Sequence, residues 1–230
     1  MSAASAPLCG LFGKTPDAGD FLRLNLQPEL AIAMDAWAQE ELARLAAEGV
    51  EASGAGACWR FVTTPRAMAG GPFAGVAAPS RDKVGRGFLC CVVAPLAGLE
   101  AQAAVACTPW FDAAEGVLEA ARAGGRGREA LGADLADLGA PGEDDLDVLS
   151  LRGRSTDDGL FLDVRSGPDG RATTLQAVLA SVPLPEGSTL WWRHVEAGAK
   201  ALVAPGLPSG VAFAALFAPG EAAQDEGATP

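Results

Sequence analysis

Two apolar runs flanking a short polar stretch, FAGVAAPSRDKVGRGFLCCVV (residues 73–93), constrain the fold more than any other segment. The polar stretch runs from Pro79 to Lys83, and two glycines follow it. Proline ends an extended run, aspartate accepts hydrogen bonds within its own turn, and glycine adopts backbone angles that other residues avoid. The segment therefore predicts a strand over 73–78, a tight connection, and a strand over 88–93.

Other elements follow from hydrophobic periodicity and from helix start and stop signals. We expect helices over 28–48, 110–122, 129–138 and 173–182, and further strands over 8–12, 58–64, 160–164, 189–192 and 211–217. The nearly continuous apolar character of the central strands indicates that both of their faces are covered. The expected fold is therefore α/β, a three-layer α/β/α sandwich around a mixed β-sheet in a single domain.

The expected domain spans residues 8–220, with a loop-rich acidic region over 124–158. Residues 1–7 are expected to form a flexible arm of small residues. The polar tail over 221–230 has too few apolar side chains to pack, so we expect it to be disordered. A chain of 230 residues buries enough surface to need neither a disulfide nor a metal for its core.

Charge and cysteine usage restrict the class of partner. The formal net charge of −12 disfavours nucleic acid and anionic membranes, because phosphates are repelled. None of the five cysteines forms a C-x-x-C pair, so we expect reduced thiols and a cytoplasmic protein. The longest apolar run, 88–99, is too short to span a bilayer, and the N-terminus does not resemble a signal peptide, so no membrane insertion is expected.

Acidic residues are concentrated between Glu129 and Gly170, where eleven acidic and three basic residues give a local net charge of −8. A solvated connecting region explains this stretch. An acidic docking surface for a basic partner is the alternative.

Three segments together resemble one protein family. PSRDKVGRGFL (79–89) is similar to the motif P-S-x-D-[RK]-V-G-R-x-[FY]-[PL] of TagF, a type VI secretion-associated protein. GLFGKTPDAGDF (10–21) resembles that family's opening G-x-[FY]-G-K-x-P-x-x-G-D-F. STLWW (188–192) is similar to its S-L-W-W segment, and a G-L-P follows at 206–208. Two departures are Ala77 and Ala78, where the family usually has a bulky residue, and Phe73 in place of a common Trp.

The resemblance implies a cytoplasmic, non-catalytic accessory protein that represses type VI secretion after translation. In that family, repression is understood as binding to a forkhead-associated-domain scaffold of the apparatus. This binding opposes the activation of the same scaffold by a threonine kinase. Some relatives are fused to a phosphatase domain; if this chain acts with a phosphatase, we expect that to be a separate chain. The alternatives are a structural component of the apparatus, or a hydrolase that uses Ser80 and Lys83.

Motifs for catalysis and cofactors are weak, so we expect no enzyme activity, no cofactor, no metal and no small-molecule substrate. Gly13-Lys14-Thr15 mimics the end of a phosphate-binding loop, but Leu8 stands where its first glycine belongs. Ser80 and Lys83 fit S-x-x-K, yet the motif lies in a turn and has no companion motif. His194, the only histidine, adjoins two tryptophans and is more typical of a structural or exposed residue.

The candidate interaction residues lie in the three matched motifs: Gly13, Lys14, Asp17, Asp20, Phe21, Ser80, Asp82, Arg86, Trp191 and Trp192. If the two loops meet, Asp20 or Asp82 pairs with the forked guanidinium of Arg86. Such a pair either only joins the loops or also forms part of a binding face. For the adjacent tryptophans, either both pack beneath helices or one is an exposed anchor.

Overall fold

The computed structural model describes residues 9–18, 21–50, 56–142, 150–156, 159–165, 179–195 and 198–218. The expected arm 1–7 and tail 221–230 lie outside these residues, as does most of the helix expected over 173–182. All five cysteines are free thiols.

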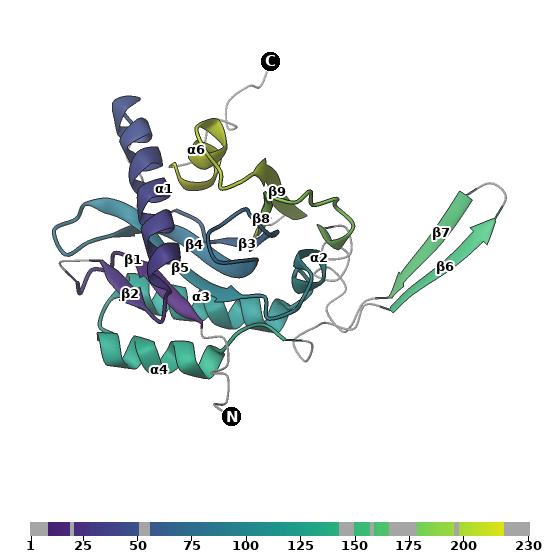
Figure 1. Ribbon diagram of the computed structural model, residues 1–230, viewed down its shortest axis with the longest axis horizontal. Helices are drawn as coiled ribbons and strands as arrows, with labels where there is room; N and C mark the ends of the chain where they lie inside the picture. The colour runs from purple at the N-terminus through teal and green to yellow at the C-terminus, as the bar shows by residue number, and fades with distance from the viewer. Residues whose placement is uncertain are drawn as a thin grey trace, which may run out of the picture.

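A seven-stranded sheet organises the chain (Figure 1). Its strands are β1 (Gly10–Gly13), β2 (Leu22–Leu24), β3 (Trp59–Thr63), β4 (Phe73–Arg81), β5 (Gly87–Pro95), β8 (Ser188–Val195) and β9 (Gly198–Pro205). Their order in space is β2-β1-β5-β4-β3-β8-β9, and every pairing among the described strands is antiparallel. The expected α/β class is confirmed. The expected mixed sheet is wrong, because every described strand runs opposite to the strands it pairs with, and no parallel pair is present among them.

The central hairpin pairs β4 with β5 from Phe73↔Pro95 to Arg81↔Gly87. We expected the first strand to end at Pro79, but Pro79 lies inside β4 opposite Leu89. The Leu89 carbonyl accepts from the Lys14 amide on the β1 side, so Pro79 needs no N–H toward β5. On its other side β3 has already ended, since the last β3–β4 pair is Trp59↔Ala77.

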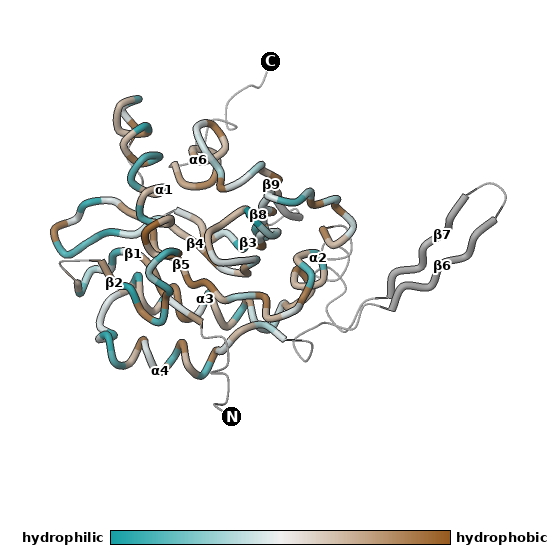
Figure 2. The backbone as a smooth tube through the Cα atoms, in the orientation of Figure 1, coloured by the Kyte–Doolittle hydropathy of each residue, from teal (hydrophilic) through white to brown (hydrophobic). Residues whose placement is uncertain are grey.

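Helices contact both faces of the sheet (Figure 1). One face packs against α2 (Ala101–Ala104), α3 (Thr108–Ala123) and α4 (Arg128–Leu138). The other packs against α1 (Pro28–Ala47) and α6 (Val211–Phe217). Over most of β4 and β5, side chains alternate between these two cores, which is why both strands are apolar almost throughout. Figure 2 shows hydrophobic residues along β5 and hydrophilic residues around the far end of the hairpin.

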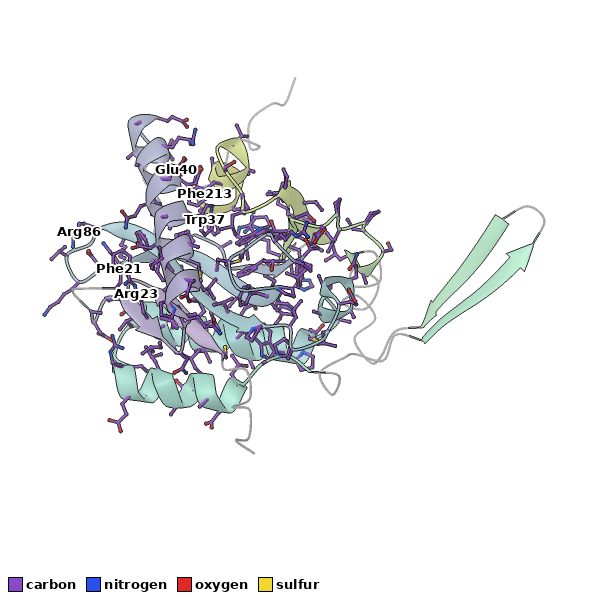
Figure 3. The ribbon with its side chains drawn as sticks, in the orientation of Figure 1. Phe21, Arg23, Trp37, Glu40, Arg86 and Phe213 are labelled. Carbon is purple, nitrogen blue, oxygen red and sulfur yellow. The ribbon has the colours of Figure 1, made fainter. Side chains whose placement is uncertain are left out.

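Residues 211–217 were expected as a strand and form the helix α6 instead. Short runs of valine and phenylalanine do not separate strand from helix by periodicity. Phe213, Leu216 and Phe217 are buried at helical spacing, and the Phe213 ring lies 5.5 Å from that of Trp37 on α1, edge to face (Figure 3). The Trp37 indole also donates to the Pro208 carbonyl at 2.8 Å, which fixes the segment before α6.

The sequence did not predict four elements: β2, β9, the short helix α2, and β6 (Ser150–Thr156). The last pairs with β7 (Gly159–Arg165) in a separate two-stranded sheet. Part of the region expected to be loop-rich is therefore strand, and another part is α4, which was expected. The helices over 28–48 and 110–122 are confirmed as α1 and α3.

Candidate functional site

The turn between β4 and β5 is built around the carboxylate of Asp82. Its Oδ1 accepts from the backbone amides of Val84 at 3.0 Å and Arg86 at 2.9 Å, and its Oδ2 accepts from Arg86 Nε at 2.7 Å. The Asp82 side chain is only 1% exposed, whereas the Arg86 side chain is 65% exposed. Aspartate folds this turn because its short side chain reaches the amides two and four residues ahead.

These bonds determine the protonation of Asp82. Burial by itself raises the pKa of the carboxyl group. The amide and guanidinium of Arg86 and the amide of Val84 outweigh burial and lower the pKa from 3.8 to about 2. Asp82 is therefore ionised at neutral pH, and its charge is neutralised locally.

Lys14 connects this turn to the loop after β1. Its Nζ lies 3.5 Å from Asp82 Oδ2, and 5.0 Å and 5.3 Å from the ring centres of Phe21 and Phe88. The two rings meet edge to face at 4.7 Å. Lys14 thus has both a carboxylate and two aromatic faces as partners, an arrangement that stabilises a partly desolvated ammonium.

Gly13 allows the loop to approach the hairpin so closely. Its φ is +141°, and a Cβ there would lie 2.2 Å from the Leu89 carbonyl oxygen on β5. Any side chain would push β1 and β5 apart, so this glycine has a structural reason to be part of the motif.

The predicted ion pair with Arg86 is confirmed for Asp82, while Asp20 lies outside the described residues. The pair lies within the turn, however, and the contact between the two loops is Lys14–Asp82. Figure 3 shows Arg86 at the outer end of the hairpin, with Phe21 closer to the sheet. Asp17 does not join the cluster. It accepts from the Gly125 amide at 2.5 Å and ties the first loop to the segment before α4.

Both tryptophans are core residues, one on each face of the sheet. Trp191 stacks on Phe61 at 4.5 Å, and Trp192 meets Phe111 at 5.0 Å, and both are almost fully buried. They pack beneath helices, so neither is available as an exposed anchor.

The S-x-x-K residues do not form a nucleophilic pair. Ser80 is 2% exposed, and its hydroxyl has no hydrogen-bond partner among the described residues. Lys83 is exposed at the tip of the turn. A serine nucleophile needs a base in hydrogen-bond contact and access to substrate, and Ser80 has neither in the part of the chain that the structure describes.

One charge network, around the buried Arg60, was not predicted from the sequence. Arg60 in β3 donates to Glu115 at 2.8 Å and to Asp112 at 2.5 Å, both on α3. Burial and the Arg60 charge lower the pKa of nearby His194, against the opposing effect of the two acids. The only sequence signal was an arginine inside an apolar strand, and the network fixes α3 on the sheet.

Within the described residues, no group of three or more His, Cys, Asp or Glu is placed to hold a metal ion. No helix in the same set is both long and apolar enough to cross a bilayer.

Comparisons with known proteins agree with the motifs. Residues 10–138 match the family model described as the TagF N-terminal domain, type VI secretion system-associated. The crystal structure of PA0076 from Pseudomonas aeruginosa PAO1 is similar with a TM-score of 0.65 and 24% identity, covering 96% of this chain and 100% of that one. A search of curated proteins finds no match.

Proposed function

Because the chain belongs to the TagF family of type VI secretion system-associated proteins, we propose that it restrains type VI secretion after translation by binding a protein of the apparatus. The observation that carries this proposal is the family match over residues 10–138, which contains both the loop after β1 and the β4–β5 turn. The proposed partner is the forkhead-associated-domain scaffold that the family resemblance implies.

Several features support a binding role rather than a catalytic one. The motif side chains form a structural cluster around Asp82, without a nucleophile and base in contact among the described residues. The net charge of −12 favours a protein partner over nucleic acid. Five free cysteines suit a reducing compartment, so we place the proposed action in the cytoplasm.

Dose dependence tests the proposal. A protein that acts by binding shifts its target by mass action, so silencing requires a level comparable to that of the scaffold. When the level of this protein is raised in steps, secretion should be silenced once that level approaches the level of the scaffold. Deleting its gene should raise secretion without changing transcription of the apparatus. The measurement is the amount of secreted effector against the cellular levels of both proteins.

Two other outcomes contradict this function. Secretion that falls on deletion identifies a structural component or an activator. Silencing at a small fraction of the scaffold level identifies turnover and hence an enzyme.

A further inference from the structure

The outer end of the β4–β5 hairpin is positively charged in an acidic protein. We call residues Arg81–Gly87 the hairpin tip. Arg81, Lys83 and Arg86 are exposed there, and Val84 at the centre is 73% exposed. The single acid of the tip, Asp82, is buried and already bonded to Arg86 and Lys14. The tip therefore presents an excess of positive charge around an apolar side chain.

The tip shares a groove with the last turns of α1 and the residues just after that helix. Leu42, Ala46 and Val50 line it on one side, and Arg81, Val84 and Arg86 line it on the other. Leu42 and Val50 are partly buried against the core, so their remaining surface is fixed in place. The groove thus combines apolar walls with guanidinium groups at its margin, and interfaces are enriched in arginine and apolar anchors.

Hydrogen bonds close the tip on itself without a partner. Besides the bonds to Asp82, the Gly85 amide donates to the Asp82 carbonyl at 2.9 Å, and Arg81 Nη1 donates to the Gly85 carbonyl at 2.9 Å. Gly85 has a φ of +86°, which glycine adopts without strain. A preorganised loop loses little conformational entropy on binding. The turn uses Asp82, Gly85 and the two guanidinium groups for its own hydrogen bonds, but nothing in these bonds requires an exposed valine at position 84 or an exposed lysine at position 83.

We propose that the hairpin tip and the adjoining α1 groove are the docking surface for an acidic segment of a protein partner. Carboxylates of that segment pair with Arg81, Lys83 and Arg86, and an apolar side chain packs on Val84 and Leu42. Charge complementarity selects an acidic occupant. The net charge of −12 disfavours nucleic acid more than a short acidic segment, because the closely spaced phosphates of nucleic acid continue beyond the tip and meet the acidic remainder of the molecule. The inference rests on the proposed function only for the identity of that partner.

Matched substitutions test the surface by calorimetric titration of the purified full chain. Val84→Ser removes the exposed apolar group, and Ile32→Ser is its control, since Ile32 is 64% exposed on α1 outside the groove. Lys83→Glu reverses a tip charge, and Arg128→Glu on α4 is its control. The two probes are the purified forkhead-associated-domain scaffold and a short synthetic peptide of alternating glutamate and leucine.

Each tip variant should bind at least one probe about tenfold more weakly than the wild type, with both controls unchanged and with wild-type thermal unfolding. Added salt should weaken wild-type binding more than it weakens binding by Lys83→Glu.

The inference is overturned if the wild type binds neither probe, or if the tip variants bind as the wild type does. It is also overturned if single-stranded DNA, or a second copy of this chain, occupies the tip in competition with the peptide. The proposed function is judged separately, on secretion by cells with raised or deleted wild-type protein. Tip-dependent binding of the peptide without binding of the scaffold supports the surface and contradicts the proposed partner.

Discussion

At the residue scale, the hydrogen bonds of Asp82 differ in how much free energy is lost when one partner is removed. The carboxylate is buried, so removing it leaves the amides of Val84 and Arg86 without their acceptor. The Arg86 guanidinium is largely in solvent, where water replaces a lost partner. An unsatisfied buried group costs more free energy than the net gain of an exposed ion pair.

Arg86→Ala should therefore lower the free energy of unfolding by less than about 1 kcal/mol. Asp82→Ala should lower it by more, because the amides of Val84 and Arg86 and the Lys14 ammonium all lose their partner, and Asp82→Asn should fall between the two because one acceptor oxygen remains. Urea unfolding of the three variants and the wild type measures this order. An Arg86→Ala variant as unstable as Asp82→Ala would mean that the exposed guanidinium, not the buried carboxylate, holds the turn.

The pH dependence of stability provides an independent measurement at the same residue. The pKa of Asp82 is about 2 in the folded chain and close to its ordinary value of 3.8 when unfolded. A depressed folded-state pKa contributes stability that is complete above the unfolded value and is lost as pH falls toward the folded one. The difference in unfolding free energy between wild type and Asp82→Asn should thus be largest above about pH 4 and shrink toward pH 2. A difference that stays constant across this range would contradict the ionised, hydrogen-bonded carboxylate.

At the element scale, the β3–β4–β5 core depends on a glycine with no room for a side chain. A Cβ on Gly75 in β4 would lie 2.4 Å from the Phe61 ring and 2.5 Å from the Val92 carbonyl oxygen. Gly75→Ala should destabilise the chain by roughly 1–3 kcal/mol, because the ring and the neighbouring strand must both move. Thermal and urea unfolding measure the effect.

Gly116 in α3 is the matched control, because a Cβ there meets nothing within 4 Å. Gly116→Ala should stabilise the chain by about 0.5–1 kcal/mol, since alanine reduces the backbone entropy of the unfolded state. A destabilised Gly116→Ala, or an unaffected Gly75→Ala, would show that local helix or strand packing differs from the arrangement described.

Elements with strong periodicity could be predicted from the sequence, and those defined by tertiary contacts could not. The helix after Pro28 and the hairpin 73–93 have signals in their own residues. The strand β2 has only three residues, and α6 is helical because Phe213 and Phe217 pack on Trp37, far away in sequence. The antiparallel order of the sheet depends on which strands meet, and apolar runs alone do not encode that.

The sequence indicated which residues form the candidate site better than it indicated how those residues are arranged in space. An aspartate two residues before a valine and four before an arginine indicates a turn held by its own side chain, and Asp82–Arg86 confirms it. Lys14 was assigned to the motif, but its position between Asp82 and two aromatic rings depends on the contact between β1 and β5. The burial of Ser80 and of both tryptophans likewise depends on which helices cover the sheet.

At the scale of the whole molecule, two separate apolar cores share one set of strands. Adjacent residues Cys90 and Cys91 in β5 point into different cores, the first toward α3 and the second toward α1. Burial raises the pKa of Cys90 to about 12 and raises that of Cys91 well above its usual range. Both thiols are thus protonated and shielded, and each reports when its own core opens.

The two cores should open together, because losing either one exposes β4 and β5, whose backbone pairing both cores need. The variants Cys90→Ala and Cys91→Ala each keep one of the two thiols. Pulse labelling with iodoacetamide across a urea series modifies the remaining thiol when its core opens, and mass spectrometry measures the labelled fraction. The midpoints for the two thiols should coincide with each other and with loss of helical circular dichroism, as expected of one cooperative unit. Labelling of Cys91 at clearly lower urea would instead show that α1 and α6 detach while α3 and α4 remain on the sheet, so that the chain unfolds in two stages.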